Sequence, residues 1–284
     1  MYALTEEVHM GLVINTNIAA LNATRVLRRS TLALNKSLER LSSGLRINRA
    51  SDDAAGLAIA EGLSSQVRGL RVAQRNAQDG INLVQIAEGS LSEVGGMLQR
   101  MRELAVQAAN GTNTASNRAD LDAEFQQLKA QITDTIDRTE FNGIFMLTSA
   151  TPIVLQTGAD GNQTTSVGGT SPAMTTTTLT IAASVLTGAD ATNPTLAIAA
   201  LDNAIGQVTT RRAALGATQN RLEFTINTLA IQEENSAAAE SAIRDADIAL
   251  ETIAFTRAQI LVAAGTSVLA QANLVPQTAL QLLG

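Results

Sequence analysis

Acidic side chains that stand close together are the main candidates for chemistry in this 284-residue chain. Asp52 and Asp53 are adjacent, and Asp245 and Asp247 are separated by one residue. Two catalytic carboxylates must face one substrate, but residues one or two positions apart do not share a helix face. Carboxylates in such places are more typical of helix caps and of partners for the helix dipole. We therefore expect no catalytic residue among them.

The composition excludes most other site chemistry. The chain has no cysteine, which removes disulfides, thiolate metal sites and cysteine nucleophiles. Its single histidine, His9, leaves no histidine-rich metal site and no Ser-His-Asp set elsewhere. The glycines around residues 158–161 lack the ligand spacing of a calcium loop. We expect no enzyme activity, cofactor or metal, and the net charge of −6 argues against nucleic acid as the main partner.

The first residues and the hydropathy of the chain bear on its processing. Residues 1–9 carry two glutamates and no basic residue, unlike a secretory signal, and a second methionine follows at Met10. We expect residues 1–9 to be a non-native leader and Met10 to be the natural start. The apolar stretch from Ile260 to Leu274 is interrupted by glycine and hydroxyl residues, so we expect no membrane-spanning segment and no membrane partner.

Proline divides the chain into two helical arms and a different middle. No proline occurs before Pro152, and the others are Pro172, Pro194 and Pro276. Proline is disfavoured inside helices because it lacks the backbone N–H and clashes with the preceding turn. The middle instead has short β-like runs between glycines, with clustered threonines. It predicts one or two small hairpins, with disorder as the alternative for residues 164–178.

Apolar residues recur every seven positions in both arms, which is typical of coiled-coil packing. In the first arm the series is Leu63, Leu70, Ala77, Val84, Leu91, Leu98 and Ala105, and a third helix carries Leu121, Phe125, Leu128, Ile132 and Ile136 on one face. In the second arm the series is Leu201, Val208, Leu215, Leu222 and Leu229.

The fold class predicted is mainly α: a long antiparallel helical hairpin or coiled-coil bundle with a small β-hairpin region at its tip. We divide it into terminal helices (10–56 with 243–284), a long-helix bundle (57–148 with 194–242) and a Thr/Gly-rich hairpin tip (149–193).

The two ends of the chain carry apolar stripes with little other chain to cover them. These stripes are Leu27, Leu34, Leu38, Leu41 and Leu45 near the start, and Leu261, Val268, Val275 and Leu282 near the end. Each leucine or isoleucine buried is worth about 1.5–3 kcal/mol, so exposed stripes favour association. Heterologous contacts that do not close into a ring give a helical array. The alternative is that the two end helices satisfy each other as a simple pair.

Ordered motifs in both arms give the chain a family resemblance. They include residues 41–48 (LSSGLRIN), 52–59 (DDAAGLAI), 99–107 (QRMRELAVQ) and 141–143 (FNG). The second arm has residues 215–221 (LGATQNR), 257–261 (RAQIL) and 265–273 (GTSVLAQAN). On these motifs the chain resembles bacterial flagellin, the subunit of the flagellar filament, in a short form with a minimal central domain.

The resemblance implies a filament whose inner tube is made by the paired terminal helices, and a chain whose main partner is itself. It also implies secretion through the flagellar type III export apparatus, with an export chaperone, cap and junction proteins as partners, and an extracellular location in the filament. It further implies that the terminal helices become ordered only on assembly.

A further implication concerns host recognition. The chain resembles flagellins seen by the Toll-like receptor for flagellin, and the matching positions are Arg100, Leu104 and Glu124. The alternative is that Arg100 and Glu124 are ordinary surface charges and that Leu104 is a core residue.

The sequence is also compatible with two other functions. Hook-filament junction proteins have similar terminal helices but are scarce in each flagellum. A flagellin-like surface protein that binds a glycan is the other alternative, although the middle of the chain has few aromatic residues for stacking on sugars.

Overall fold

The computed structural model describes residues 16–149, 151–168 and 173–281, with side chains up to residue 274. The predicted leader, residues 1–9, and Leu282 lie outside these residues. The described elements are five helices and four short strands: α1 (Ile18–Ser43), α2 (Ala54–Ala108), α3 (Ala115–Arg138), β1 (Glu140–Phe141), β2 (Ile144–Phe145), β3 (Ile153–Gln156), β4 (Thr164–Val167), α4 (Thr192–Arg244) and α5 (Ile248–Gln281). They form two units, one from residues 1–64 and 237–284 and the other from residues 65–236.

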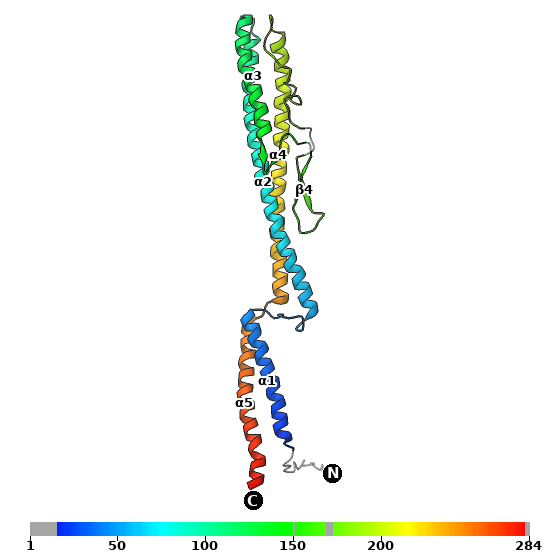
Figure 1. Cartoon of the computed structure of the whole chain (residues 1–284), viewed down its shortest axis with the longest axis vertical. Helices are drawn as coiled ribbons and strands as arrows, with labels where there is room; N and C mark the ends of the chain where they lie inside the picture. The colour runs from blue at the N-terminus through cyan, green and yellow to red at the C-terminus, as the bar shows by residue number, and fades with distance from the viewer. Residues whose placement is uncertain (1–15, 150, 169–172, 282–284) are drawn as a thin grey trace, which may run out of the picture. The chain divides into compact units, whose positions relative to one another are not determined.

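The first unit contains α1 and α5 as an antiparallel pair (Figure 1). Asn17 caps the start of α1 and donates from Nδ2 to the carbonyl of Ala272, at 2.7 Å. Gly44 ends α1 in the left-handed region at φ 73°, where a side chain would be strained, and its N–H bonds to the Arg40 carbonyl.

A narrow seam joins α1 to α5. Small residues lie in it: Ser30 and Ser37 are buried on α1, and Ala258 is buried on α5. A side chain at Gly265 would come within 3.3 Å of Leu27. Small residues at these positions allow the two helix backbones to approach closely.

Backbone hydrogen bonds join the segment that follows α1 to the segment that precedes α5. Leu45 and Asp245 form an isolated antiparallel bridge, the Arg46 N–H donates to the Arg244 carbonyl at 2.7 Å, and the Ala246 N–H donates to the Gly44 carbonyl at 2.9 Å. The two chain segments are therefore held in register where they leave α1 and enter α5.

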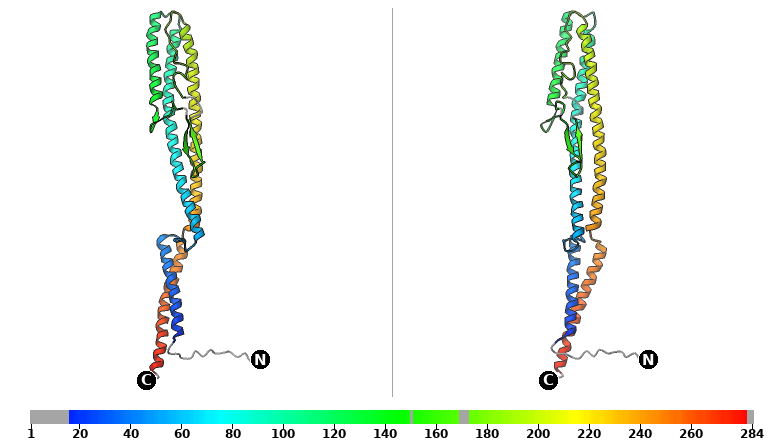
Figure 2. Two further views of the ribbon diagram at one scale, coloured as in Figure 1. Left: turned by 45° about the vertical axis from the view of Figure 1, so that its right-hand side comes forward. Right: turned by 90° about the vertical axis from the view of Figure 1, so that its right-hand side faces the viewer.

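The second unit is a bundle of α2, α3 and α4, which lie side by side in all three views (Figures 1 and 2). The predicted seven-residue series face its interior: from Leu70 to Ala105 every member on α2 is buried, as are Leu201, Val208, Leu222 and Leu229 on α4. Phe125, Ile132 and Ile136 of α3 enter the main cluster with residues 87–108 of α2.

Two hairpins follow α3. Asn142 and Gly143, with φ of 52° and 77°, turn β1 into β2, and this geometry is the type I′ turn for which Asn-Gly is favoured. The other hairpin pairs β3 with β4, including Ile153 with Val167, and so gives residues 164–167 a defined strand.

The second hairpin packs against the side of α2, where two glycines eleven residues apart share a helix face. A side chain at Gly69 would meet Ala159, and one at Gly80 would meet Leu155 and Leu222. Asn76 of α2 also donates to the Gln156 carbonyl at 2.9 Å. The predicted fold class is confirmed, but this hairpin lies beside the helices and not beyond their ends (Figure 2).

Candidate functional site: the apolar surface of the terminal helices

Large apolar side chains remain exposed on α1 and α5 after the two helices have paired. On α5, Ile260 is 63% exposed and Val268 is 59% exposed. We call the whole set the terminal apolar surface; it consists of Ile18, Leu21, Val26, Leu32 and Leu38 on α1, and Ile248, Leu250, Ile253, Ile260, Leu261, Val268 and Leu274 on α5. Covering each such side chain is worth about 1.5–3 kcal/mol, so the surface favours association.

The residues of the predicted stripes fall on different sides of the pair. Leu27, Leu34 and Leu41 are half-buried because they share the α1 seam with Ser30 and Ser37, and Leu45 is half-buried in the connection after α1. Leu38, Leu261 and Val268 are exposed. The side chain of Val275 and all of Leu282 lie outside the described residues.

The seam on α5 is one position away from the predicted stripe. Its half-buried or buried positions are Phe255, Ala258, Val262, Gly265, Leu269 and Ala272. Sequence reasoning followed the seven-residue series of Leu261 and Val268 and so missed these positions, where small residues (Ala258, Gly265 and Ala272) alternate with larger ones (Phe255, Val262 and Leu269). The alternating spacing of three and four residues in this set is the signal that could have found it.

The exposed side of α5 includes a shallow apolar groove of about 390 Å³. It is lined by Thr252, Ile253, Thr256, Arg257, Ile260 and Leu261, all from α5. The methyl and methylene groups of these side chains form its walls, and only Arg257 brings a charge. Such a groove suits apolar side chains of another helix and offers no acid, base or nucleophile for catalysis.

The expectation that no segment is apolar enough to span a membrane is wrong for α5. In the part of the chain that the structure describes, one segment, Ile248–Leu274, is long and apolar enough to cross a membrane by length and composition, with a mean hydropathy of 1.5. The glycine, threonine and serine at residues 265–267 interrupt the apolar run but add no charge. The mean hydropathy therefore stays high.

The closely spaced carboxylates lie at helix starts and connections. Asp53 accepts a hydrogen bond from the Gly56 N–H at 2.9 Å at the start of α2, and Asp247 accepts from the Ala249 N–H at 2.9 Å at the start of α5. The hydrogen bond from Lys36 lowers the pKa of Asp52. Each carboxylate thus stabilises local structure.

The three positions matched to host recognition lie on the outside and inside of the bundle. Arg100 and Glu124 are exposed and form an ion pair across α2 and α3, with Nη2 to Oε1 at 3.0 Å. Hydrogen bonds from Arg100 to Glu103 and Glu124 raise the pKa of Arg100. Leu104 is buried in the main cluster. A partner that approaches this face therefore meets Arg100 and Glu124, with Leu104 beneath them.

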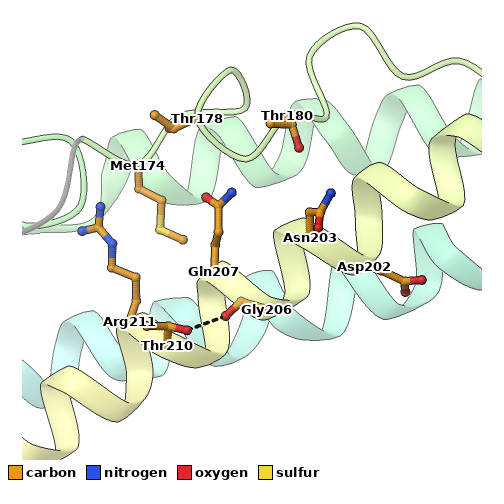
Figure 3. A pocket seen from close by; sticks show the side chains of 9 residues that line it. All are labelled: Met174, Thr178, Thr180, Asp202, Asn203, Gly206, Gln207, Thr210 and Arg211. Atoms are coloured by element: carbon orange, nitrogen blue, oxygen red, sulfur yellow. Dashed lines mark hydrogen bonds between the residues drawn. The ribbon is translucent and has the colours of Figure 1, made fainter.

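A polar groove of about 710 Å³ lies between α4 and the segment around residues 174–180 (Figure 3). It is lined by Met174, Thr178, Thr180, Asp202, Asn203, Gly206, Gln207, Thr210 and Arg211. Asp202 is engaged by Arg102 at 2.6 Å, and partial burial lowers the pKa of Arg211. No aromatic ring lines the groove, so it lacks the stacking platform expected of a glycan site.

Comparison with known proteins covers both arms. Residues 14–151 match the model of the bacterial flagellin N-terminal helical region, and residues 198–283 match that of the C-terminal helical region. A flagellin from Halalkalibacterium halodurans is 48% identical over 96% of this chain and 100% of its own length. A flagellar filament 33 kDa core protein from Treponema phagedenis is 43% identical over 96% of this chain and all of its own.

Among solved structures, a protein described as flagellar hook-associated, from Vibrio parahaemolyticus, is 14% identical. It covers 68% of this chain and 100% of its own, with a TM-score of 0.57, which shows a shared fold alone. The two family models and the near full-length relatives, which agree with the helical arms described above, decide the family. The chain belongs to the bacterial flagellin family.

Proposed function

We propose that this chain is the structural subunit of a bacterial flagellar filament, which assembles from copies of the chain and serves swimming motility. The observation that carries the proposal is the terminal apolar surface, which pairing of α1 with α5 leaves uncovered. The relatives named flagellin and flagellar filament core protein support the same function over nearly the whole chain.

In the proposed filament, the exposed side of α5 packs against terminal helices of neighbouring copies. Ile253, Ile260, Leu261 and Val268 would be covered there, and the carbon-lined groove on α5 would receive apolar side chains of a neighbour. Contacts between unlike faces of successive copies extend without closing, which yields a helical polymer. The terminal helices would form the inner tube of the filament.

The family also supports finer proposals about partners and location. The chain would be exported through the flagellar type III apparatus, accompanied by an export chaperone, and would fold beneath the filament cap. Junction proteins would join the filament to the hook, and the mature location would be the extracellular filament. Its role would be structural and not enzymatic.

The Toll-like receptor for flagellin is a further proposed partner. The exposed Arg100 and Glu124 would make the contact, and Leu104 would support the helix face that carries Arg100. A reporter assay with the unassembled chain tests this proposal, with R100A and E124A as variants. We expect each variant to weaken the response, and no response to saturating wild-type chain would contradict the proposal.

Seeded polymerisation tests the filament proposal. We expect purified chain to elongate filament seeds, as followed by electron microscopy. The substitutions Ile260→Asp and Val268→Asp should abolish elongation because each would bury an unpaired charge between copies. Since both side chains are exposed in the single chain, the variants should keep the wild-type circular dichroism spectrum and unfolding midpoint.

The matched control is Gln78→Asp, which adds the same charge at an exposed position of α2 in the second unit. It should elongate seeds like wild type. Elongation by both α5 variants at the wild-type rate would contradict the proposal. The junction alternative rests on a likeness of fold alone, and counting copies per flagellum separates it, because a filament subunit is abundant.

A further inference from the structure

Side chains of α3 hold an extended stretch of the same chain by its backbone. Gln126 donates from Nε2 to the Ser184 carbonyl at 3.3 Å, and Asp122 accepts from the Leu186 N–H at 2.7 Å. We call residues 182–189 the strap. Two more side chains of α3 continue this ladder of contacts toward the ends of the strap: Arg118 donates to the Ala189 carbonyl and Lys129 to the Ala182 carbonyl, each at 3.1 Å.

The spacing of these contacts explains how a helix can hold an extended chain. Asp122 and Gln126 are four residues apart on α3, which is a rise of about 6 Å along the helix axis. Leu186 and Ser184 are two residues apart in the strap, which is about 6.6 Å in an extended chain. Side chains one turn apart on a helix therefore meet every second residue of an extended guest. They hold its backbone groups, whatever its side chains are.

A second pair of side chains with this spacing lies on α4. Asn203 and Gln207 are four residues apart, are both exposed, and line the polar groove of about 710 Å³. Figure 3 shows their side chains extending from α4 toward the segment that carries Thr178 and Thr180. Within the described part of the chain neither amide takes part in a hydrogen bond. Each of them offers both donors and an acceptor to a guest.

The floor of this groove leaves room for a backbone. Gly206 lines the groove between the two amides of α4, and a Cβ added there would have nothing within 4 Å. A guest can therefore approach the backbone of α4 closely at this position. Met174 is buried and also lines the groove, so part of the floor is apolar.

The far wall of the groove contains a strained residue. Thr180 has a φ of 61°, which is unusual for a β-branched residue, and its two neighbours Leu179 and Ile181 are fully buried. Such a conformation persists only where its surroundings hold it, and strained residues gather at binding sites. The two buried neighbours thus fix Thr180 at the wall that faces Asn203 and Gln207.

We propose that the groove on α4 binds an extended peptide segment of another protein and holds it by its backbone. The amides of Asn203 and Gln207 bond to alternate residues of this guest, as the side chains of α3 do with the strap. Asp202 is already paired with Arg102 at 2.6 Å, so the guest need not carry a charge for it. Small side chains suit the guest best because walls on both sides enclose it.

A second copy of this chain is a poor source for the guest. Among the described residues, its extended stretches are engaged within their own chain: β3 pairs with β4, and α3 holds the strap. A folded copy would have to break these contacts before it could offer either stretch. A flexible segment of a different protein carries no such cost beyond its own ordering.

Titration of the full, unassembled chain with a peptide tests this inference. The probe is the acetylated and amidated peptide AASVLTGA, which has the sequence of the strap, and the readout is the shift of the side-chain amide NMR signals of Asn203 and Gln207. We expect a dissociation constant on the order of 1 mM, because each hydrogen bond contributes little net free energy. The same peptide with its four central amides N-methylated should bind about tenfold more weakly, because it has lost those donors.

Two glycines of α4 give a matched pair of variants. Gly206→Leu fills the groove and should weaken binding of the peptide about tenfold, with an unchanged unfolding midpoint, because nothing of the chain lies near that position. Gly216→Leu is the control, since Gly216 has the same open space but does not line the groove, and it should bind like wild type. The double variant N203L/Q207L should weaken binding as Gly206→Leu does, because it removes both amides.

Three results would overturn the inference. They are no detectable binding to the wild-type chain, equal binding by wild type and Gly206→Leu, and equal binding of the plain and the N-methylated peptide. Equal binding by Gly206→Leu with signal shifts confined to α3 would show that the peptide only exchanges with the strap. Tighter binding of sorbitol than of the peptide would assign the groove to polyols instead.

The inference does not depend on the proposed function, and the two can fail separately. The groove lies within residues 65–236, so Val268→Asp should lose seeded elongation and still bind the peptide. Loss of elongation by Gly206→Leu, together with no binding of the peptide to wild type, would assign the groove to contacts between copies and overturn the peptide assignment.

Discussion

Arg118 is a buried charge that forms no ion pair with any carboxylate of the described residues, and it organises one end of the second unit. Its Nε donates to the Ala108 carbonyl at 3.0 Å, at the end of α2, and its Nη1 donates to the Ala189 carbonyl at 3.1 Å, just before α4. One side chain on α3 thus joins the last turn of α2 to the segment that starts α4. Backbone acceptors satisfy the guanidinium group where a helix end would otherwise leave carbonyls unpaired.

Replacement of Arg118 by Met should lower the free energy of unfolding by about 3 kcal/mol, because buried carbonyls lose charged donors. Arg118→Lys should recover only part of this loss, since an ammonium group lacks the planar fork of donors. Urea unfolding followed by circular dichroism measures the change. Arg138→Gln, at an exposed ion pair, is the control and should cost under about 1 kcal/mol. Wild-type stability of Arg118→Met would contradict this role.

Two glycines of α2 offer a direct comparison of packing with helix propensity. A side chain at Gly80 would meet Leu155 and Leu222, whereas Gly89 has open space around it. We expect Gly80→Val to destabilise the chain by about 1–3 kcal/mol through overpacking and Gly89→Val to be nearly neutral or slightly stabilising. The same urea titration compares them, and equal effects would show that the hairpin does not press on α2 at Gly80.

At the scale of elements, exposed ion pairs connect the helices of the second unit. Arg71 of α2 reaches Glu233 of α4 at 2.6 Å, and Arg212 of α4 reaches Glu88 of α2 at 3.2 Å. Because the arginines of both pairs are exposed and Glu233 is only half-buried, each pair contributes little on its own. The heptad core holds the helices together, and the ion pairs add a dependence on pH.

Acid should weaken the fold through these carboxylates. The hydrogen bond from Arg71 holds the pKa of Glu233 below its ordinary value of 4.5, and Lys36 holds that of Asp52 below 3.8. A carboxylate with a lowered folded pKa stabilises the fold fully above its ordinary pKa, and this contribution is lost as pH falls through the folded value. We expect the urea midpoint to fall between pH 6 and pH 3.

Glu233→Gln should have a smaller fall in midpoint over this range than wild type, because it removes one of the titrating groups. Glu93→Gln, at an exposed carboxylate of α2 without an ion pair among the described residues, is the control and should fall like wild type. Identical pH dependence in both variants would contradict a role for the Arg71–Glu233 pair.

The sequence predicted the bundle well because its signal is regular. Leu70 to Ala105 on α2 and Leu201 to Leu229 on α4 repeat every seven residues, and large apolar side chains at that spacing have to face a neighbour. The same spacing finds only the α1 side of the α1–α5 seam, through Leu27, Leu34 and Leu41. Ser30, Ser37 and Gly265 pack there because they are small, and a pattern of large residues passes over them.

The site was only partly predictable for a related reason. The seven-residue spacing places Leu27, Leu34 and Leu41 on one helix face, and Leu261 and Val268 on another. The spacing does not tell which of the two faces is buried within the same chain. The first face turns to α5, whereas the second stays exposed. The position of the β3–β4 hairpin could not be predicted either. The hairpin packs against α2 where Gly69 and Gly80 have no side chain, and only the folded helix brings these two glycines to one face.

At the scale of the whole molecule, the buried apolar clusters and the broad exposed apolar surface belong to different parts of the chain. The clusters of buried apolar residues that hold α2, α3 and α4 lie within residues 65–236. The terminal unit has a narrow seam of small residues and a broad exposed apolar surface. Under the proposed function, a chain organised in this way would keep its bundle folded while its terminal helices gain further burial against other copies.

Deletion of residues 1–56 should separate these two properties. The bundle should keep its cooperative thermal unfolding because its buried clusters all remain, whereas seeded elongation should be lost because α5 no longer has α1 along its seam. Calorimetry and electron microscopy of the same preparation give the two readouts. A deletion of residues 1–9 is the control and should elongate seeds like the full chain. Elongation by the longer deletion would contradict the assignment of assembly to the terminal helices, and loss of cooperative unfolding would show that the bundle depends on them.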